Sequence, residues 1–303
     1  MSERLTTEAR DGQRFIEGMT LGLKRSQRLG VELPVSSVRR LRHMLRTRVS
    51  EHPALYLPFA RRKYPGPEPE VISSQTQLVI DGYTRSAGTF AVYAFQLAQD
   101  EPVRIAHHLH APAQLIAAAR MRIPTLVLIR EPQGAILSQL VQEPHVALRD
   151  ALVAYARFHS CLRPYRRSFV MGEFNEVTQD FGAVIRRLNE QFGTSFREFV
   201  HTEANMRECF ELIKERPPIK ERPTRSSILL KFESGLATRD ELRRERQRRP
   251  EPLPTRDFWV PSAEKEARKA ALRERWLQPE LAALRARAQA VYQWFLEEPS
   301  PGA

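Results

Sequence analysis

Residues 77–98 read QLVIDGYTRSAGTFAVYAFQLA, and the fold expected for the chain is worked out from this segment. Val79 and Ile80 are typical of a buried strand, and Gly82 permits a tight exit from it. From Thr89 onward, apolar residues recur at helical spacing. The segment therefore predicts a strand, a short turn of small and cationic residues, and a helix that begins close to the end of the strand.

Such a turn is expected to bind an anion. The first backbone N–H groups of a helix have no partner within the helix, and the helix dipole is positive at that end. Arg85, Ser86 and Thr89 add further donors. A general nucleotide-binding P-loop reads GxxxxGK[ST], but here Thr89 follows Gly88 and no lysine is present. The segment thus argues against an ordinary ATPase or GTPase.

A second segment, TLVLIREPQGAILSQLV at residues 125–141, repeats the pattern. Its apolar strand ends at Arg130, and the chain then turns and enters a helix that carries Ser138. Across a strand-to-helix turn, this spacing can bring the guanidinium and the hydroxyl group onto one phosphate. Because arginine supplies paired donors and a permanent charge, Arg130 is the expected anchor.

Together the two segments resemble the PAPS-dependent sulfotransferase family, whose donor is 3′-phosphoadenosine 5′-phosphosulfate (PAPS). GYTRSAGT is similar to the family's 5′-phosphosulfate loop, with Arg85 where lysine is usual. REPQGAILS is similar to its 3′-phosphate motif, in which a proline and a serine follow the arginine at fixed distances. The resemblance covers roughly residues 77–200. It implies donor contacts from Arg85, Ser86, Ala87, Gly88, Thr89, Phe90, Arg130 and Ser138.

The resemblance also implies the fold, a parallel β-sheet flanked by helices as in P-loop NTPases, with added N- and C-terminal helices. Two positions depart from the family pattern: Ala87 stands where glycine is usual, and Gly88 where serine or threonine is usual. Since alanine resists positive φ, the turn is expected to differ in shape. Arg85 keeps the cation but cannot give up a proton, so its expected role is electrostatic stabilisation of the leaving phosphate.

His110 is the candidate catalytic base, because HAPAQLI is similar to the segment in which soluble sulfotransferases place a base histidine. An imidazole suits this task because its pKa lies near neutrality. His107 and His108 are weaker candidates, an acid elsewhere stays open, and all three histidines could be ordinary polar residues at a strand end. No metal site is expected, because Cys161 and Cys209 stand alone and the histidines lack the usual zinc spacings.

The function that these residues imply is transfer of the sulfuryl group from PAPS to a hydroxyl of a small molecule, lipid or glycan, with PAP as the product. A sulfotransferase-like protein that binds the nucleotide without catalysis is the alternative. A kinase-like phosphate transferase is disfavoured, because the P-loop lysine and an obvious magnesium carboxylate are missing.

The 303 residues are expected to form one sulfotransferase domain. It would comprise a basic helical extension (1–70), an α/β donor-binding core (71–213), and a linker loop with C-terminal helices (214–303). Two cysteines and no apolar leader favour the cytoplasm. The net charge of +12 is accompanied by no recognised nucleic-acid module, so nucleic acid is not an expected partner. The oligomeric state stays open.

Outside the two motifs, several elements can be predicted. Residues 150–165 favour a helix, 168–177 a strand, and a further helix should end at Gly193. Residues 214–256 are rich in proline and charge and favour loop around a short ordered element. Ser262 should cap a helix, whose Lys265, Arg268 and Lys269 either face solvent or reach a donor phosphate. In the next helix, one apolar face is made of Leu281, Leu284, Ala288, Val291 and Phe295.

Near the N-terminus, a helix with one apolar face and several arginines is expected. The apolar face is made of Val38, Leu41, Met44 and Leu45. Packing of this face on the domain is the favoured interpretation, and a peripheral contact with an anionic membrane stays open.

Overall fold

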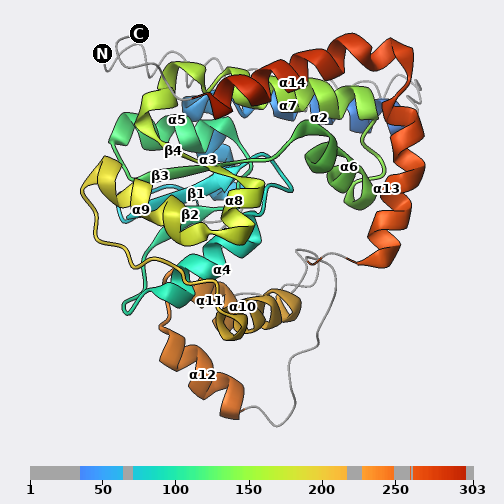
Figure 1. Cartoon of the computed structure of the whole chain (residues 1–303). Coiled ribbons are helices and arrows are strands. Elements are labelled where there is room, and N and C mark those ends of the chain that lie inside the picture. The colour runs from blue at the N-terminus through green and yellow to red at the C-terminus, as the bar shows by residue number, and fades with distance from the viewer. Residues whose placement is uncertain (1–34, 64–70, 217–226, 249–259, 261, 298–303) are drawn as a thin grey trace, which may run out of the picture.

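A four-stranded parallel β-sheet forms the centre of the protein in the computed structural model, which describes residues 35–63, 71–216, 227–248, 260 and 262–297 (Figure 1). The strands are β1 (Leu78–Gly82), β2 (Ile105–His107), β3 (Thr125–Ile129) and β4 (Val170–Glu173). Their spatial order is β2-β1-β3-β4, and every neighbouring pair is parallel. The predicted α/β class with a parallel sheet is therefore confirmed.

Alternate residues of the central strands face opposite sides of the sheet. Val79 and Val127 belong to one buried hydrophobic cluster, whereas Ile80 and Leu128 belong to the other. Both faces are therefore covered, which explains why these strands are apolar throughout rather than alternating with polar residues.

Helices supply the cover on each face (Figure 1). The first cluster takes its helical residues from α3 (Pro53–Lys63), α5 (Pro112–Met121), α6 (Pro132–Gln142), α7 (Leu148–Ser160), α13 (Ala263–Trp276) and α14 (Ala282–Leu296). The second takes them from α4 (Gly88–Ala98), α8 (Phe174–Gln179), α9 (Phe181–Phe192), α10 (Glu203–Glu215), α11 (Ile228–Glu233) and α12 (Arg239–Arg248). The remaining helical elements are α2 (Val35–Val49), η1 (Arg163–Ser168) and η3 (Pro279–Leu281).

The predicted C-terminal helices are present. The side chain of Ser262 accepts a hydrogen bond from the Lys265 N–H and so caps α13, as expected. In and just before α14, the predicted apolar face is inward, with Ala288, Val291 and Phe295 buried. Gly193 ends α9 in the left-handed conformation, which also agrees with the prediction.

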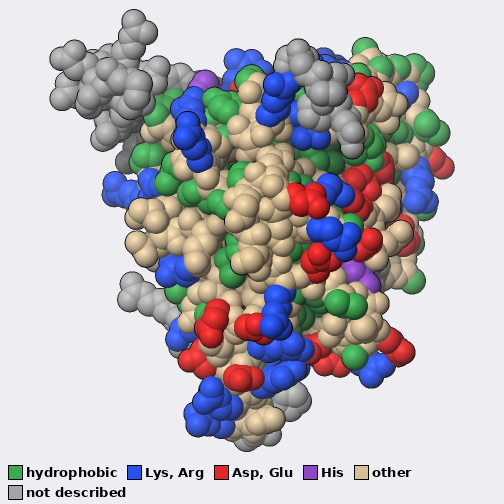
Figure 2. All heavy atoms as spheres, turned by 60° about the vertical axis from the view of Figure 1, so that its left-hand side comes forward, with side chains coloured by type: hydrophobic (Ala, Val, Ile, Leu, Met, Phe, Trp, Pro, Cys, Tyr) green, Lys and Arg blue, Asp and Glu red, His purple; other side chains and the backbone are tan. Residues whose placement is uncertain are grey.

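The charged region after residue 214 is more helical than its sequence indicates. Helix α12 extends to Arg248, in a segment predicted as loop. Leu242 is buried, and ion pairs join Arg239 to Glu208 and Arg246 to Glu215 on α10. Tertiary contacts therefore overcome the local composition. Figure 2 shows basic and acidic side chains interspersed over the lower part of the molecule, where α10 to α12 lie in Figure 1.

The apolar face expected on α2 is only partly packed: Leu45 is half-buried, and Val49 at the end of the helix packs against the first hydrophobic cluster. Leu41 and Met44 are both 46% exposed, and the side chain of Val38 lies outside the described residues. Polar contacts also hold the helix, such as the ion pair between Arg40 and Asp150 on α7. Among the described residues, no helix has the length and apolar character needed to cross a membrane.

Candidate functional site

The turn between β1 and α4 carries the first motif. Arg85 and Ala87 have φ of 69° and 66°, and Ala87 is the N-cap of α4. Alanine thus adopts the left-handed conformation that glycine accepts more readily, at a cost of about 1–2 kcal/mol. Gly88 is the first residue of the helix and has no positive φ. The chain therefore enters α4 through a left-handed turn although glycine is missing at position 87, and the first residues of α4 line a cavity.

A cavity of about 450 Å³ lies at the carboxyl ends of the strands, in front of this helix N-terminus. In parallel α/β sheets, ligands typically bind at this edge. Its volume is in the range of small-molecule and cofactor sites. The cavity is lined by Thr84, Arg85, Ala87, Gly88, Thr89, Phe90, His108, His110, Arg130, Ser138, Gln142, Phe174, Thr178, Phe210, Ile213, Val260, Lys265, Glu266 and Lys269.

Direct contacts join the two sequence motifs in the wall of this cavity. Arg85 Nε donates a hydrogen bond to Ser138 Oγ at 2.9 Å. Arg130 Nη1 approaches the carbonyl oxygen of Arg85 at 3.4 Å, although 45 residues separate the two arginines. The structure therefore brings Arg85, Arg130 and Ser138 together. Ser86 is the exception among the predicted donor contacts: it is buried, and it is not among the residues that line the cavity.

The wall is strongly cationic. Arg85, Arg130, Lys265 and Lys269 are the basic residues among the described lining, against the single carboxylate of Glu266. Burial and the neighbouring Arg130 lower the pKa of the Arg85 guanidinium to about 10. Burial likewise lowers the pKa of Arg130. Both guanidinium groups stay charged at neutral pH, and their closeness is a cost that a bound anion would relieve.

Three contacts in and around the second motif position Arg130. The carboxylate of Glu131 accepts a hydrogen bond from the Gly134 N–H and caps α6. The Arg130 carbonyl accepts one from the Tyr155 hydroxyl at 2.6 Å. The guanidinium of Arg130 stacks on the ring of Phe174. The side chain and the backbone of Arg130 are thus both held.

His110 lies where the large cavity meets a second, smaller one. Its backbone N–H donates to the buried carboxylate of Asp81, and its Nδ1 lies 2.9 Å from the Gly82 carbonyl. Because a carbonyl only accepts, Nδ1 must carry the ring proton in this contact. Nε2 is then left with a lone pair, and the side chain is 30% exposed. His110 therefore has the tautomer that a general base requires.

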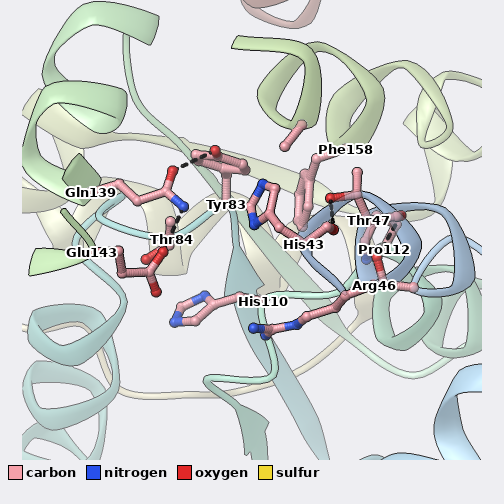
Figure 3. Close-up of a pocket in the computed structure, with 12 residues that line it drawn as sticks. His43, Arg46, Thr47, Tyr83, Thr84, His110, Pro112, Gln139, Glu143 and Phe158 are labelled. Carbon is pink, nitrogen blue, oxygen red and sulfur yellow. Dashed lines mark hydrogen bonds between the residues drawn. The ribbon is translucent and has the colours of Figure 1, made fainter. Parts of the chain in front are cut away.

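The second cavity, of about 100 Å³, lies on the other side of His110. Figure 3 shows His43, Arg46, His110 and Glu143 around this hollow, and Thr84 and His110 line both cavities. Burial lowers the pKa of His43, and its buried Nε2 has no hydrogen-bond partner among the described residues. The hollow thus presents polar and charged groups of both signs beside the candidate base.

His107 and His108 are more enclosed than His110. His107 is fully buried, and His108 reaches the large cavity but contacts Thr89 through Nε2 at 3.1 Å. Burial and the nearby Arg216 hold the pKa of His108 well below its usual range.

Some residues of the site have no signal within the two motifs. Both Phe174, which follows the last residue of β4, and Lys269, which lies on α13, line the large cavity. Phe174 could have been found, because it follows the strand next to that of Arg130 in a parallel sheet. Lys265 and Lys269 line the cavity, whereas Arg268 is exposed and pairs with Glu264. Contact of these residues with a donor phosphate stays a prediction.

Fold and site together define an α/β protein with a cationic cavity at the carboxyl edge of a parallel sheet. No protein-family model matches the chain, and no curated protein sequence matches it. A structural comparison finds mouse sulfotransferase SULT7A1 complexed with PAP, at 10% sequence identity and a TM-score of 0.33. The match covers 76% of this chain and 92% of that one.

Proposed function

We propose that the protein transfers the sulfuryl group of PAPS to a hydroxyl group of an acceptor. The donor would lie in the large cavity, with its 5′-phosphosulfate at the N-terminus of α4 and its 3′-phosphate between Arg130 and Ser138. The donor carries phosphate groups on the 3′- and 5′-oxygens of one ribose, and these two groups match the two cationic motifs.

One contact carries the proposal, the hydrogen bond from Arg85 Nε to Ser138 Oγ at 2.9 Å. It joins two motifs that the sequence alone could only place on separate strand-to-helix turns. Their meeting in one cavity is what a donor with two phosphate groups requires. An ordinary mononucleotide site would need only the first motif.

The reaction follows from the position of His110 between the two cavities. The acceptor would occupy the smaller cavity and give its hydroxyl proton to His110 Nε2. The acceptor oxygen would form a bond to sulfur while the bond between sulfur and the 5′-phosphate oxygen breaks. PAP would leave with the electron pair of the broken bond. Arg85 and the backbone N–H groups at the start of α4 would stabilise the charge that develops on the phosphate.

The test is turnover. Purified protein is incubated with PAPS and a panel of hydroxyl compounds, and PAP release is measured. With an active acceptor, His110→Ala should bind PAP as the wild type does and lose about 100-fold or more in rate. Full activity in this variant would show that another residue is the catalytic base. PAP binding with no turnover of any acceptor would favour the inactive nucleotide-binding alternative.

A further inference from the structure

A polar cluster, mostly buried, lies beside the large cavity and includes His108 from its lining. His107 ends the edge strand β2, His108 follows it, and Glu233 ends α11. The side chains of His107 and Glu233 are fully buried, and that of His108 is 11% exposed. Two imidazoles and one carboxylate thus meet in the interior, although Glu233 is far from the histidines in sequence.

Three potential ligand atoms converge in this cluster. His107 Nδ1 and His108 Nδ1 are 2.7 Å apart. Glu233 Oε1 lies 3.1 Å from His108 Nδ1 and 3.8 Å from His107 Nδ1. A tetrahedral zinc ion with ligand bonds of about 2.0–2.2 Å separates its ligand atoms by about 3.3 Å. The three observed separations lie on both sides of that value.

The outer ring nitrogens have partners of the kind that metal-binding histidines use. His107 Nε2 lies 3.3 Å from Ser234 Oγ, and His108 Nε2 lies 3.1 Å from Thr89 Oγ1. If each Nε2–H donates to its hydroxyl oxygen, both Nδ1 lone pairs point into the cluster. Two lone pairs at 2.7 Å repel each other, so in this tautomer pair a cation must lie between the rings, whereas in the other tautomers one Nδ1–H donates to its neighbour.

We propose that His107, His108 and Glu233 form a metal site, and that Zn²⁺ is the ion it takes. Two imidazole nitrogens and one carboxylate oxygen suit zinc, whereas Mg²⁺ and Ca²⁺ prefer oxygen ligands alone. A metal shared by β2 and α11 would fasten the helix to the edge strand of the sheet. The proposal does not rest on the proposed sulfuryl transfer, although His108 also lines the large cavity and contacts Thr89.

The residues around Glu233 affect the affinity of the site for a metal ion. Arg216 is buried and donates to both carboxylate oxygens from Nε, and to Oε1 from Nη2, at 3.0–3.1 Å. These bonds orient the carboxylate, as outer hydrogen bonds do around metal ligands. The guanidinium charge also opposes a dication, so the affinity should be weaker than at a site of the same ligands without the arginine.

The experiment is a calorimetric titration of the full chain with Zn²⁺ alone. The protein is freed of any affinity tag, treated with chelator and dialysed. One saturable site per chain is expected, and His108→Ala should abolish it. Ser234→Ala, which removes an outer partner of His107, should weaken it about tenfold or more. His145→Ala, which changes an exposed histidine outside the cluster, should leave the titration unchanged.

Folding of each variant is checked by circular dichroism in the absence of metal. His108→Ala is the main test because its side chain is the least buried of the three, and Glu233→Gln is a second test that keeps the size of the side chain. Zn²⁺ should also raise the melting temperature of the wild type and not that of His108→Ala. The absence of a saturable site, or a site that survives in a folded His108→Ala variant, would overturn the proposal.

Discussion

The guanidinium carbon of Arg130 lies 3.8 Å from the centre of the Phe174 ring. These residues follow adjacent parallel strands, β3 and β4, whose carboxyl ends meet at the cavity. An aromatic face fixes the plane of a guanidinium and interacts favourably with its charge. Phe174 therefore holds the Arg130 guanidinium in one plane at the wall of the cavity.

Replacing Phe174 should weaken the binding of PAP. A cation–π contact of this type contributes about 0.5–2 kcal/mol, so Phe174→Ala should raise the dissociation constant for PAP about two- to thirty-fold. Phe174→Tyr keeps the aromatic face and serves as the matched control. Calorimetric titration with PAP measures both, and equal affinity of the wild type and Phe174→Ala would remove this role of the ring.

A substitution at Ala87 tests the geometry of the turn between β1 and α4 through its effect on stability. Its φ of 66° costs alanine more than glycine in the folded state. Glycine also gives the unfolded chain more freedom, which offsets part of the gain. Ala87→Gly should therefore raise the free energy of unfolding by about 0.5–1 kcal/mol, as measured by urea denaturation. A less stable variant would contradict the left-handed geometry of the loop.

Gly82 permits a close approach between β1 and β3. A Cβ atom at this position would lie 2.2 Å from the carbonyl oxygen of Leu128, which is backbone and cannot rotate away. Gly82→Ala should therefore destabilise the protein by about 2–4 kcal/mol, because the two strands must separate. Gly88→Ala is the control, since the nearest atom to its Cβ would be at an ordinary 3.9 Å. Similar unfolding midpoints for the two variants would argue against this strand pairing.

His159 should make stability depend on pH. Its Nδ1 lies 3.0 Å from the Tyr155 carbonyl, and its buried Nε2 has no hydrogen-bond partner among the described residues. Burial lowers its pKa from 6.5 to about 4. Below pH 6.5 the unfolded chain therefore binds a proton that the folded protein resists, and stability falls as the pH decreases toward 4.

The expected loss from this group is about 2 kcal/mol at pH 5 relative to pH 8. His159→Phe should reduce the loss by that amount, because phenylalanine does not titrate. The rings around this position are Tyr83, Tyr155, Phe158 and Phe295, which can accommodate another aromatic residue. Urea unfolding at the two pH values gives the comparison, and an unchanged pH dependence in the variant would show that His159 is not responsible.

The central part of the fold could be predicted from local sequence. The apolar segments that contain Val79 and Val127 are strong signals, because strands buried on both faces are apolar throughout. The turn residues after them place Arg85 and Arg130 at the same edge of the sheet. The site could therefore be anticipated as far as two turns that carry arginine at one edge of the sheet, whereas the direct contact between them could be seen only in the structure.

Other features depend on contacts between distant segments. Strand β2 has only three residues, and α12 is a charged segment held by ion pairs to α10. The cluster of His107, His108 and Glu233 follows no spacing rule, because its third member comes from α11. The contact between these three residues therefore could not be predicted from a local sequence pattern.

The central claim, a 3′-phosphate site at Arg130 and Ser138, is tested most directly by comparing PAP with 5′-AMP. These ligands differ only in the 3′-phosphate, so calorimetric titration of both against the wild type and Arg130→Ala isolates that group. Arg149→Ala is the control, because Arg149 is exposed and does not line the cavity. We predict that the wild type and Arg149→Ala bind PAP at least about 100-fold more tightly than 5′-AMP, since charged hydrogen bonds contribute about 1.5–3 kcal/mol each. Arg130→Ala should lose most of this preference. Equal binding of the two ligands by the wild type, or a preference that persists in Arg130→Ala, would contradict the account.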